Sequence, residues 1–172
     1  MEKGYVHVYT GNGKGKTTAM LGLALRACGA KLRVYIGQFV KSSEYSEVDA
    51  IKSCLPNITI EQYGPGFLCQ REIVPSDVEV IKKGFEKACA AVFSGEYDIV
   101  MLDEINVAVY LGLLSVQSVL ELIRTKPAHV ELVLTGRYAA PEIIEAADLA
   151  SEVTALKHYY TSGVPARDGI ER

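Results

Sequence analysis

The fold of this chain is decided by the stretch Gly11-Asn12-Gly13-Lys14-Gly15-Lys16-Thr17-Thr18. An apolar run, residues 5–9, precedes the stretch, and helix-forming residues 19–25 follow it. A strand, a glycine-rich turn and a helix in this order typically form a phosphate-binding loop (P-loop). The glycines let backbone N–H groups converge on anionic oxygens, and the helix N-terminus adds partial positive charge. The alternative is a tight turn without a ligand. We favour nucleotide binding because Gly-Lys-Thr-Thr stands at the junction of strand and helix.

Two side chains of this loop have expected roles. Lys16 supplies a point charge for terminal phosphates, and Thr17 supplies a hydroxyl for Mg²⁺. The spacing is unusual, because the common motif has four residues between its first glycine and the Gly-Lys pair, whereas three separate Gly11 from Gly15. Either Thr10 takes the first glycine position or the loop is one residue short. The expected nucleotide-binding residues are Gly11, Asn12, Gly13, Lys14, Gly15, Lys16, Thr17 and Thr18.

Length and composition limit the functional classes. With 172 residues, the chain suits one domain, 1–172, with a sizeable core. A net charge of −3 gives no electrostatic case for binding nucleic acid. No apolar run is long enough to span a membrane, and the N-terminus leads directly into a strand, so we expect no signal peptide and a cytoplasmic protein. None of the four cysteines forms a C-x-x-C pair, which argues against a disulfide framework.

Apolar runs alternate with helical patterns along the chain. Strands are expected at 5–9, 32–36, 58–63, 98–103 and 130–136, with a possible last strand at 153–156. Helices are expected at 17–28, 75–94, 115–124 and 141–147, and the polar stretch 41–49 is expected to be mobile. This alternation predicts an α/β fold of the P-loop NTPase-like (RecA-like) type, with a mostly parallel sheet covered by helices on both faces. Ligands then bind beyond the carboxyl ends of the strands.

Polar residues at three strand ends are candidates for this site. Asp103 and Glu104 follow four apolar residues, which is typical of the acidic strand end that supports Mg²⁺ beside a P-loop. Which of the two carboxylates lies nearer the metal is open, and solvated acids are the alternative. Arg137 follows the strand 130–136 and could bind anionic oxygens, although an exposed salt bridge is an equal possibility. Lys41 follows another strand end, where a solvated lysine is the simpler expectation.

Taken together, these motifs resemble those of the ATP:corrinoid adenosyltransferases over nearly the whole chain. The resemblance is carried by residues 10–19 (TGNGKGKTTA), 38–41 (QFVK), 66–67 (GF), 102–104 (LDE) and 135–137 (TGR), and by the tail residues 157–158, 163–164 and 169–170. This combination of motifs at these intervals is specific.

The resemblance implies a reaction in which the 5′-deoxyadenosyl group of ATP is transferred to a Co(I) corrinoid and triphosphate is released. It implies ATP and a corrinoid as substrates, and Mg²⁺ (or Mn²⁺) as the metal. The triphosphate is expected to lie in the loop with reversed polarity, so that C5′ faces the corrinoid. The implied catalytic residues are Lys16, Thr17, Glu104 and Phe67. The implied metal ligands are Thr17, Asp103 and Glu104, and Arg137 joins the residues that bind the nucleotide.

The chain departs from the family pattern in three places. Leu68-Cys69 stands where members commonly have Thr-Trp, and the chain contains no Trp. Lys41-Ser42 replaces the usual Lys-Gly, and the first strand begins without the N-terminal helix that members often carry. The resemblance also implies a homodimer and a reductase, such as a flavoprotein, that supplies Co(I). The alternative function is that of a small P-loop kinase or ATPase without corrinoid chemistry.

Overall fold

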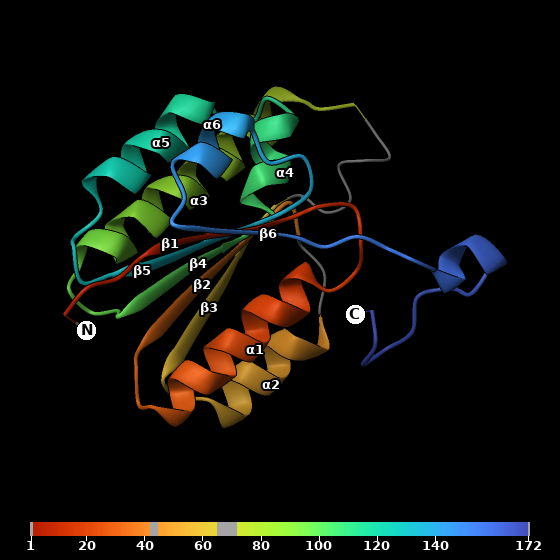
Figure 1. Cartoon of the computed structure of the whole chain (residues 1–172), viewed down its shortest axis with the longest axis horizontal. Coiled ribbons are helices and arrows are strands. Elements are labelled where there is room, and N and C mark those ends of the chain that lie inside the picture. Colours follow the sequence, from red (N-terminus) through yellow and green to blue (C-terminus); the bar gives the residue numbers. More distant parts are fainter. Residues whose placement is uncertain (1, 42–44, 65–71, 172) are drawn as a thin grey trace.

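The computed structural model describes residues 2–41, 45–64 and 72–171. Its centre is a sheet of six parallel strands in the order β3-β2-β4-β5-β1-β6 (Figure 1). The strands are β1 (Val6–Thr10), β2 (Val34–Phe39), β3 (Ile58–Tyr63), β4 (Ile99–Asp103), β5 (Glu131–Thr135) and β6 (Leu149–Glu152). The central strands β2 and β4 are buried along their whole length, as parallel strands covered on both faces must be.

Helices cover both faces of this sheet. They are α1 (Lys16–Gly29), α2 (Ser46–Cys54), α3 (Pro75–Phe93), α4 (Ile105–Tyr110), α5 (Val116–Thr125) and α6 (Pro141–Glu145), followed by the 3₁₀ turn η2 (Tyr159–Ser162). Figure 1 shows α1 and α2 on one face and α3, α4, α5 and α6 on the other. The fold class is therefore the one predicted from the sequence, with every strand pairing parallel.

The two faces have separate hydrophobic cores. Met20 and Ala24 of α1 pack with Ile36 and Met101 beneath α1 and α2, whereas the larger core lies beneath α3 and α5. Alternate residues of the central strands serve opposite cores because strand side chains alternate between faces. Within the described ranges, no helix combines the length and hydropathy that a membrane crossing requires.

Two predictions about the elements need correction, and one helix was not predicted. Residues 46–49, expected to belong to a mobile polar stretch, form the first turn of α2. The helix α4 was not predicted; it begins two residues after β4 ends. The last strand is β6 at 149–152 rather than 153–156, and it pairs with β1 at the edge of the sheet. Ser115 caps α5 by accepting a hydrogen bond from the N–H of Ser118, and Pro141 opens α6.

Candidate functional site

The candidate site lies where the carboxyl ends of four neighbouring strands meet. The P-loop follows β1, Thr135 ends β5, Asp103 ends β4 and Lys41 follows β2. Because β2, β4, β5 and β1 are adjacent in the sheet, residues that are far apart in the sequence converge at this edge.

The P-loop is the five-residue connection 11–15 between β1 and α1. Thr10 ends β1, so it belongs to the strand rather than to the loop. Gly15 precedes α1 with a φ of 122°, a conformation that favours glycine. The N-cap residue Gly15 has no side chain to cap α1, which leaves the start of the helix suited to an anion.

Lys16 is the buried cation of this loop. Its side chain is 5% exposed, and Nζ donates to the carbonyl oxygens of Gly11 (2.7 Å) and Gly13 (2.8 Å). Burial lowers the pKa of Lys16, and the negative charge of Glu104 partly offsets this shift. The ammonium is thus held within the loop that is expected to receive phosphates.

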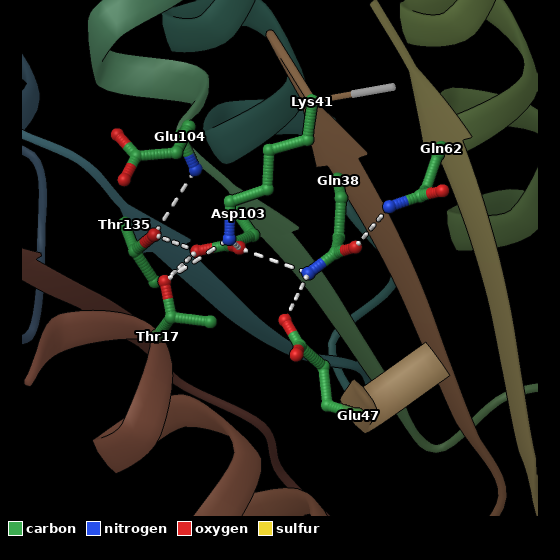
Figure 2. A network of polar contacts seen from close by, with 8 residues as sticks. All are labelled: Thr17, Gln38, Lys41, Glu47, Gln62, Asp103, Glu104 and Thr135. Carbon is green, nitrogen blue, oxygen red and sulfur yellow. Dashed lines mark hydrogen bonds and ion pairs between the residues drawn. The ribbon is translucent and has the colours of Figure 1, made fainter. Parts of the chain in front are cut away.

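A hydrogen-bond network surrounds Asp103, which is fully buried (Figure 2). The hydroxyls of Thr17 (2.9 Å) and Thr135 (2.6 Å) both donate to Oδ1. The Lys41 ammonium lies 2.8 Å from Oδ2, and the Gln38 amide donates to the same oxygen over 3.3 Å. The carboxylate therefore has a donor on each oxygen and one cation as a partner, which is how a buried charge is tolerated.

The network extends from Asp103 toward α2 and the edge strand β3. The fully buried Gln38 amide also donates to Glu47 Oε1 (3.4 Å), and Gln38 Oε1 accepts a hydrogen bond from Gln62 Nε2 (3.0 Å). Both ends of the Gln38 amide are satisfied, so the side chain is fixed between β4 and α2 (Figure 2).

Glu104 lies in the same site but is oriented differently from Asp103. It adopts the left-handed conformation (φ 59°), and its N–H donates to Thr135 Oγ1. In Figure 2 its carboxylate points away from the Asp103 network. Burial and the charge of Asp103 raise the pKa of Glu104, while Lys41, Lys16 and Arg137 counteract this rise. Of the two carboxylates, Asp103 is the one that accepts a hydrogen bond from Thr17.

Lys41 does not have the solvated position expected from the sequence. Its side chain is 16% exposed and forms an ion pair with Asp103. Burial by itself lowers the pKa of Lys41, but the charge and hydrogen bond of Asp103, helped by Glu104 and Glu47, raise it overall. Arg137, in contrast, is exposed and lies close enough for its charge to act on Lys16 and Glu104.

The C-terminal segment lies against the P-loop. The Gly13 N–H donates to Val153 O (2.7 Å), and Lys14 Nζ donates to Ile170 O (2.8 Å). Glu171 lies 3.8 Å from the same ammonium. The tail thus holds the Lys14 ammonium beside the P-loop. The other loop residues, Asn12 and Thr18, are exposed.

The donors around Asp103 fit Mg²⁺ better than a transition metal. Among the described residues, no group of three or more His, Cys, Asp or Glu side chains could hold a metal ion. A hydroxyl and a carboxylate, as in Thr17 and Asp103, suffice for Mg²⁺, which keeps several water and phosphate ligands. Phe67, the aromatic residue predicted for the corrinoid, lies outside the described residues.

Sequence reasoning did not identify the partners of Asp103. Gln38 and Lys41 reach Asp103 because β2 pairs with β4, and Thr135 reaches it because β4 pairs with β5; neither pairing was visible in the sequence. The sequence did not indicate a role for Glu47 in the site, because α2 was not predicted.

Comparisons with known proteins identify the family. The family model described as ATP:corrinoid adenosyltransferase BtuR/CobO/CobP matches residues 2–172. The corrinoid adenosyltransferase of Pseudomonas aeruginosa is 32% identical over 99% of this chain and 84% of its own length. The corrinoid adenosyltransferase of Sinorhizobium sp is 33% identical over 99% of this chain and 81% of its own length. That of Escherichia coli K12 is 31% identical over 99% of this chain and 86% of its own length.

A solved structure supports the fold independently. The genome packaging NTPase B204 of Sulfolobus turreted icosahedral virus 2, determined in complex with sulfate, matches with a TM-score of 0.52 and 16% identity over 90% of this chain and 76% of its own. That likeness concerns the fold alone. The family match and the relatives show that this chain belongs to the ATP:corrinoid adenosyltransferases, a family of enzymes.

Proposed function

We propose that this enzyme transfers the 5′-deoxyadenosyl group of ATP to a Co(I) corrinoid in adenosylcobalamin biosynthesis or salvage. The observation that carries the proposal is the 2.9 Å hydrogen bond between Thr17 and Asp103, in a chain that matches this family over 2–172. It joins the P-loop helix to the acidic strand end. That pairing of hydroxyl and carboxylate typically supports the metal of a bound nucleoside triphosphate.

Thr17 and Asp103 would hold Mg²⁺ or Mn²⁺, with Glu104 beside them. The metal would supply positive charge to the triphosphate when bound. Asp103 keeps the Thr17 hydroxyl oriented, and Thr135 in turn fixes the carboxylate by donating to the same oxygen. Glu104 would lie beside the metal's outer ligands, because its side chain lies outside the Asp103 network.

The other residues of the loop would bind the triphosphate. Lys16, the N–H groups at the start of α1 and the exposed Arg137 offer positive charge and donors, and Lys14 could join them on leaving the tail. In the reaction, the cobalt lone pair forms a bond to C5′ of ATP, and the C5′–O bond breaks. Triphosphate departs with the bonding electron pair. No general base is needed, so the protein acts by positioning and by stabilising the leaving group.

Further features of the proposal follow from the family. The triphosphate is bound with reversed polarity relative to kinases, and Phe67 faces the corrinoid. The enzyme is a homodimer, is cytoplasmic and receives Co(I) from a reductase such as a flavoprotein. Light scattering of the purified protein tests the dimer, and a structure with bound ATP tests the polarity.

An anaerobic product assay tests the reaction. Incubation with ATP, Mg²⁺ and chemically reduced cobalamin should yield adenosylcobalamin and triphosphate in equal amounts, detected by absorbance and anion-exchange chromatography. If ADP and phosphate were the only nucleotide-derived products, the proposal would be wrong and a kinase or ATPase activity would replace it.

A further inference from the structure

Lys41 lies at the position where a metal would contact the protein. Its ammonium is 2.8 Å from Asp103 Oδ2 and 3.5 Å from Thr17 Oγ1. These are the two side chains proposed above as metal ligands. The ammonium and a divalent ion therefore compete for the same pair of groups.

Asp103 needs a cation in this environment. Its side chain is fully buried, and its other donors, Thr17, Thr135 and Gln38, are neutral. Among the described residues, Lys41 is the one that forms an ion pair with Asp103. A buried carboxylate without a counter-charge is strongly unfavourable, so Lys41 stabilises the site until another cation replaces it.

The residue before Lys41 has a strained backbone conformation. Val40 has a φ of 61°, in the left-handed region that β-branched residues avoid. Its N–H donates to Tyr63 O (2.9 Å), which holds the strained residue at the end of β2. Strain of this kind persists only where the surrounding structure fixes it, and it is concentrated at functional sites.

A close backbone contact fixes the same turn from the other side. A Cβ on Gly64 would lie 2.6 Å from Lys41 N and 2.8 Å from the Val40 carbonyl carbon. Only glycine permits the chain after β3 to approach the turn so closely. The backbone position of Lys41 is therefore fixed by β2 and β3 together.

Two further groups beside Asp103 attract the Lys41 ammonium. The Tyr45 ring centroid lies 5.1 Å from Lys41 Nζ, and the Glu47 carboxylate on α2 attracts the same charge. The flexible lysine stem allows the ammonium to move away from Asp103 while it stays near these groups.

We propose that Lys41 is the resident cation of the Asp103 site and that a divalent metal displaces it, so that metal loading and release of Lys41 are one exchange. The inference rests on the proposed metal site at Thr17 and Asp103. An ammonium and a divalent ion in contact with one carboxylate repel each other, so the two do not occupy it together. The released ammonium adds positive charge beside the departing triphosphate.

Binding of Mn²⁺, measured by electron paramagnetic resonance without nucleotide or corrinoid, tests the exchange. Lys41→Met removes the competitor and should bind Mn²⁺ at least about tenfold more tightly than the unchanged protein. Lys41→Arg keeps the charge and should not show this gain. Lys83→Met, which changes an exposed lysine of α3 paired with Glu79, is the matched control and should have no effect.

The variant Asp103→Asn tests the proposed metal site separately from the exchange with Lys41. If Asp103→Asn weakens Mn²⁺ binding but Lys41→Met does not strengthen it, the exchange is refuted and the metal site stands. If Asp103→Asn has no effect on Mn²⁺ binding, both are refuted. Neither result depends on adenosyl transfer, which the product assay measures separately.

A second measurement uses the unchanged protein, in case Lys41→Met does not fold. Acetylation of individual lysines is followed by mass spectrometry with and without saturating Mn²⁺. Lys41 should react at least about threefold faster once Mn²⁺ has displaced it, because an ammonium freed from a buried ion pair is more accessible. Lys83 should react at the same rate in both conditions. An unchanged rate at Lys41 would refute the exchange.

Discussion

The Thr17 hydroxyl donates a 2.9 Å hydrogen bond to Asp103 Oδ1 and so joins the first turn of α1 to the end of β4. The two residues are 86 positions apart in the sequence. Their contact depends on the parallel sheet, which brings the P-loop and the acidic strand end to one edge. The two side chains proposed as metal ligands are therefore in direct contact with each other.

Replacing Thr17 tests the importance of this hydroxyl. Thr17→Val should lower adenosyl transfer by about 100-fold or more, since both the metal ligand and the partner of Asp103 are lost. The free energy of unfolding should fall by only about 1 kcal/mol, because Thr135 still donates to the same oxygen. Thr17→Ser keeps the hydroxyl and should retain most of the activity. Equal rates for the Val and Ser variants would contradict a role for the hydroxyl.

Lys16→Ala should separate ligand binding from folding. Within the described part of the chain, the hydrogen bonds of the Lys16 ammonium go to the backbone carbonyls of Gly11 and Gly13, so its loss should leave the far-ultraviolet circular dichroism spectrum unchanged. Affinity for inorganic triphosphate, measured by calorimetry, should fall at least about 100-fold because a charge-assisted contact is lost. Lys83→Ala is the exposed control. Substantial unfolding of Lys16→Ala would show that the residue is structural instead.

Local sequence signals predicted the parts of this fold that depend on neighbouring residues. The P-loop and the buried strands β2, β4 and β5 are encoded in short stretches. The helix α2 gave a weak signal, because only Val48 and Ile51 of its nine residues are buried. The strand β6 has four exposed residues without an alternating pattern and exists through its pairing with β1.

The break between β4 and α4 could not be predicted from periodicity. Residues 99–110 are mostly apolar, and only the left-handed conformation of Glu104 separates the strand from the helix. The role of Lys41 was missed for a different reason. Its partner Asp103 is 62 residues away, and the contact requires β2 and β4 to be neighbours in the sheet. Such a contact follows from strand order, which single-sequence patterns do not encode.

Two glycine substitutions should have opposite effects on stability. Gly64→Ala forces a Cβ into the Val40–Lys41 backbone and should lower the free energy of unfolding by about 1–3 kcal/mol. Gly22→Ala, within the exposed face of α1, meets nothing within 4 Å and should raise it by about 0.5–1 kcal/mol. Urea unfolding of both variants checks the contrast. A stabilising Gly64→Ala would mean that the turn holding Lys41 can relax.

The raised pKa of Glu104 predicts that this residue destabilises the protein at neutral pH. The folded state favours the protonated carboxyl, since burial and the charge of Asp103 oppose ionisation. The protonated Glu104 carboxyl therefore makes its full contribution to the free energy of unfolding below the pKa that this group has in the unfolded chain. That contribution is lost as the pH rises through the higher pKa of the group in the folded state. Glu104→Gln should match the unchanged protein near pH 4 and be more stable at pH 7.5.

Urea unfolding at a series of pH values, with EDTA present to exclude metal ions, measures this difference. The pKa of Glu79 is lowered by its hydrogen bond to Lys83, so Glu79→Gln should show at most a small trend of the opposite sign. Because the stabilised Glu104→Gln variant should also lose adenosyl transfer, the buried carboxylate would be a group retained for function at a cost in stability. A stability difference for Glu104→Gln that stayed flat across this pH range would refute that account.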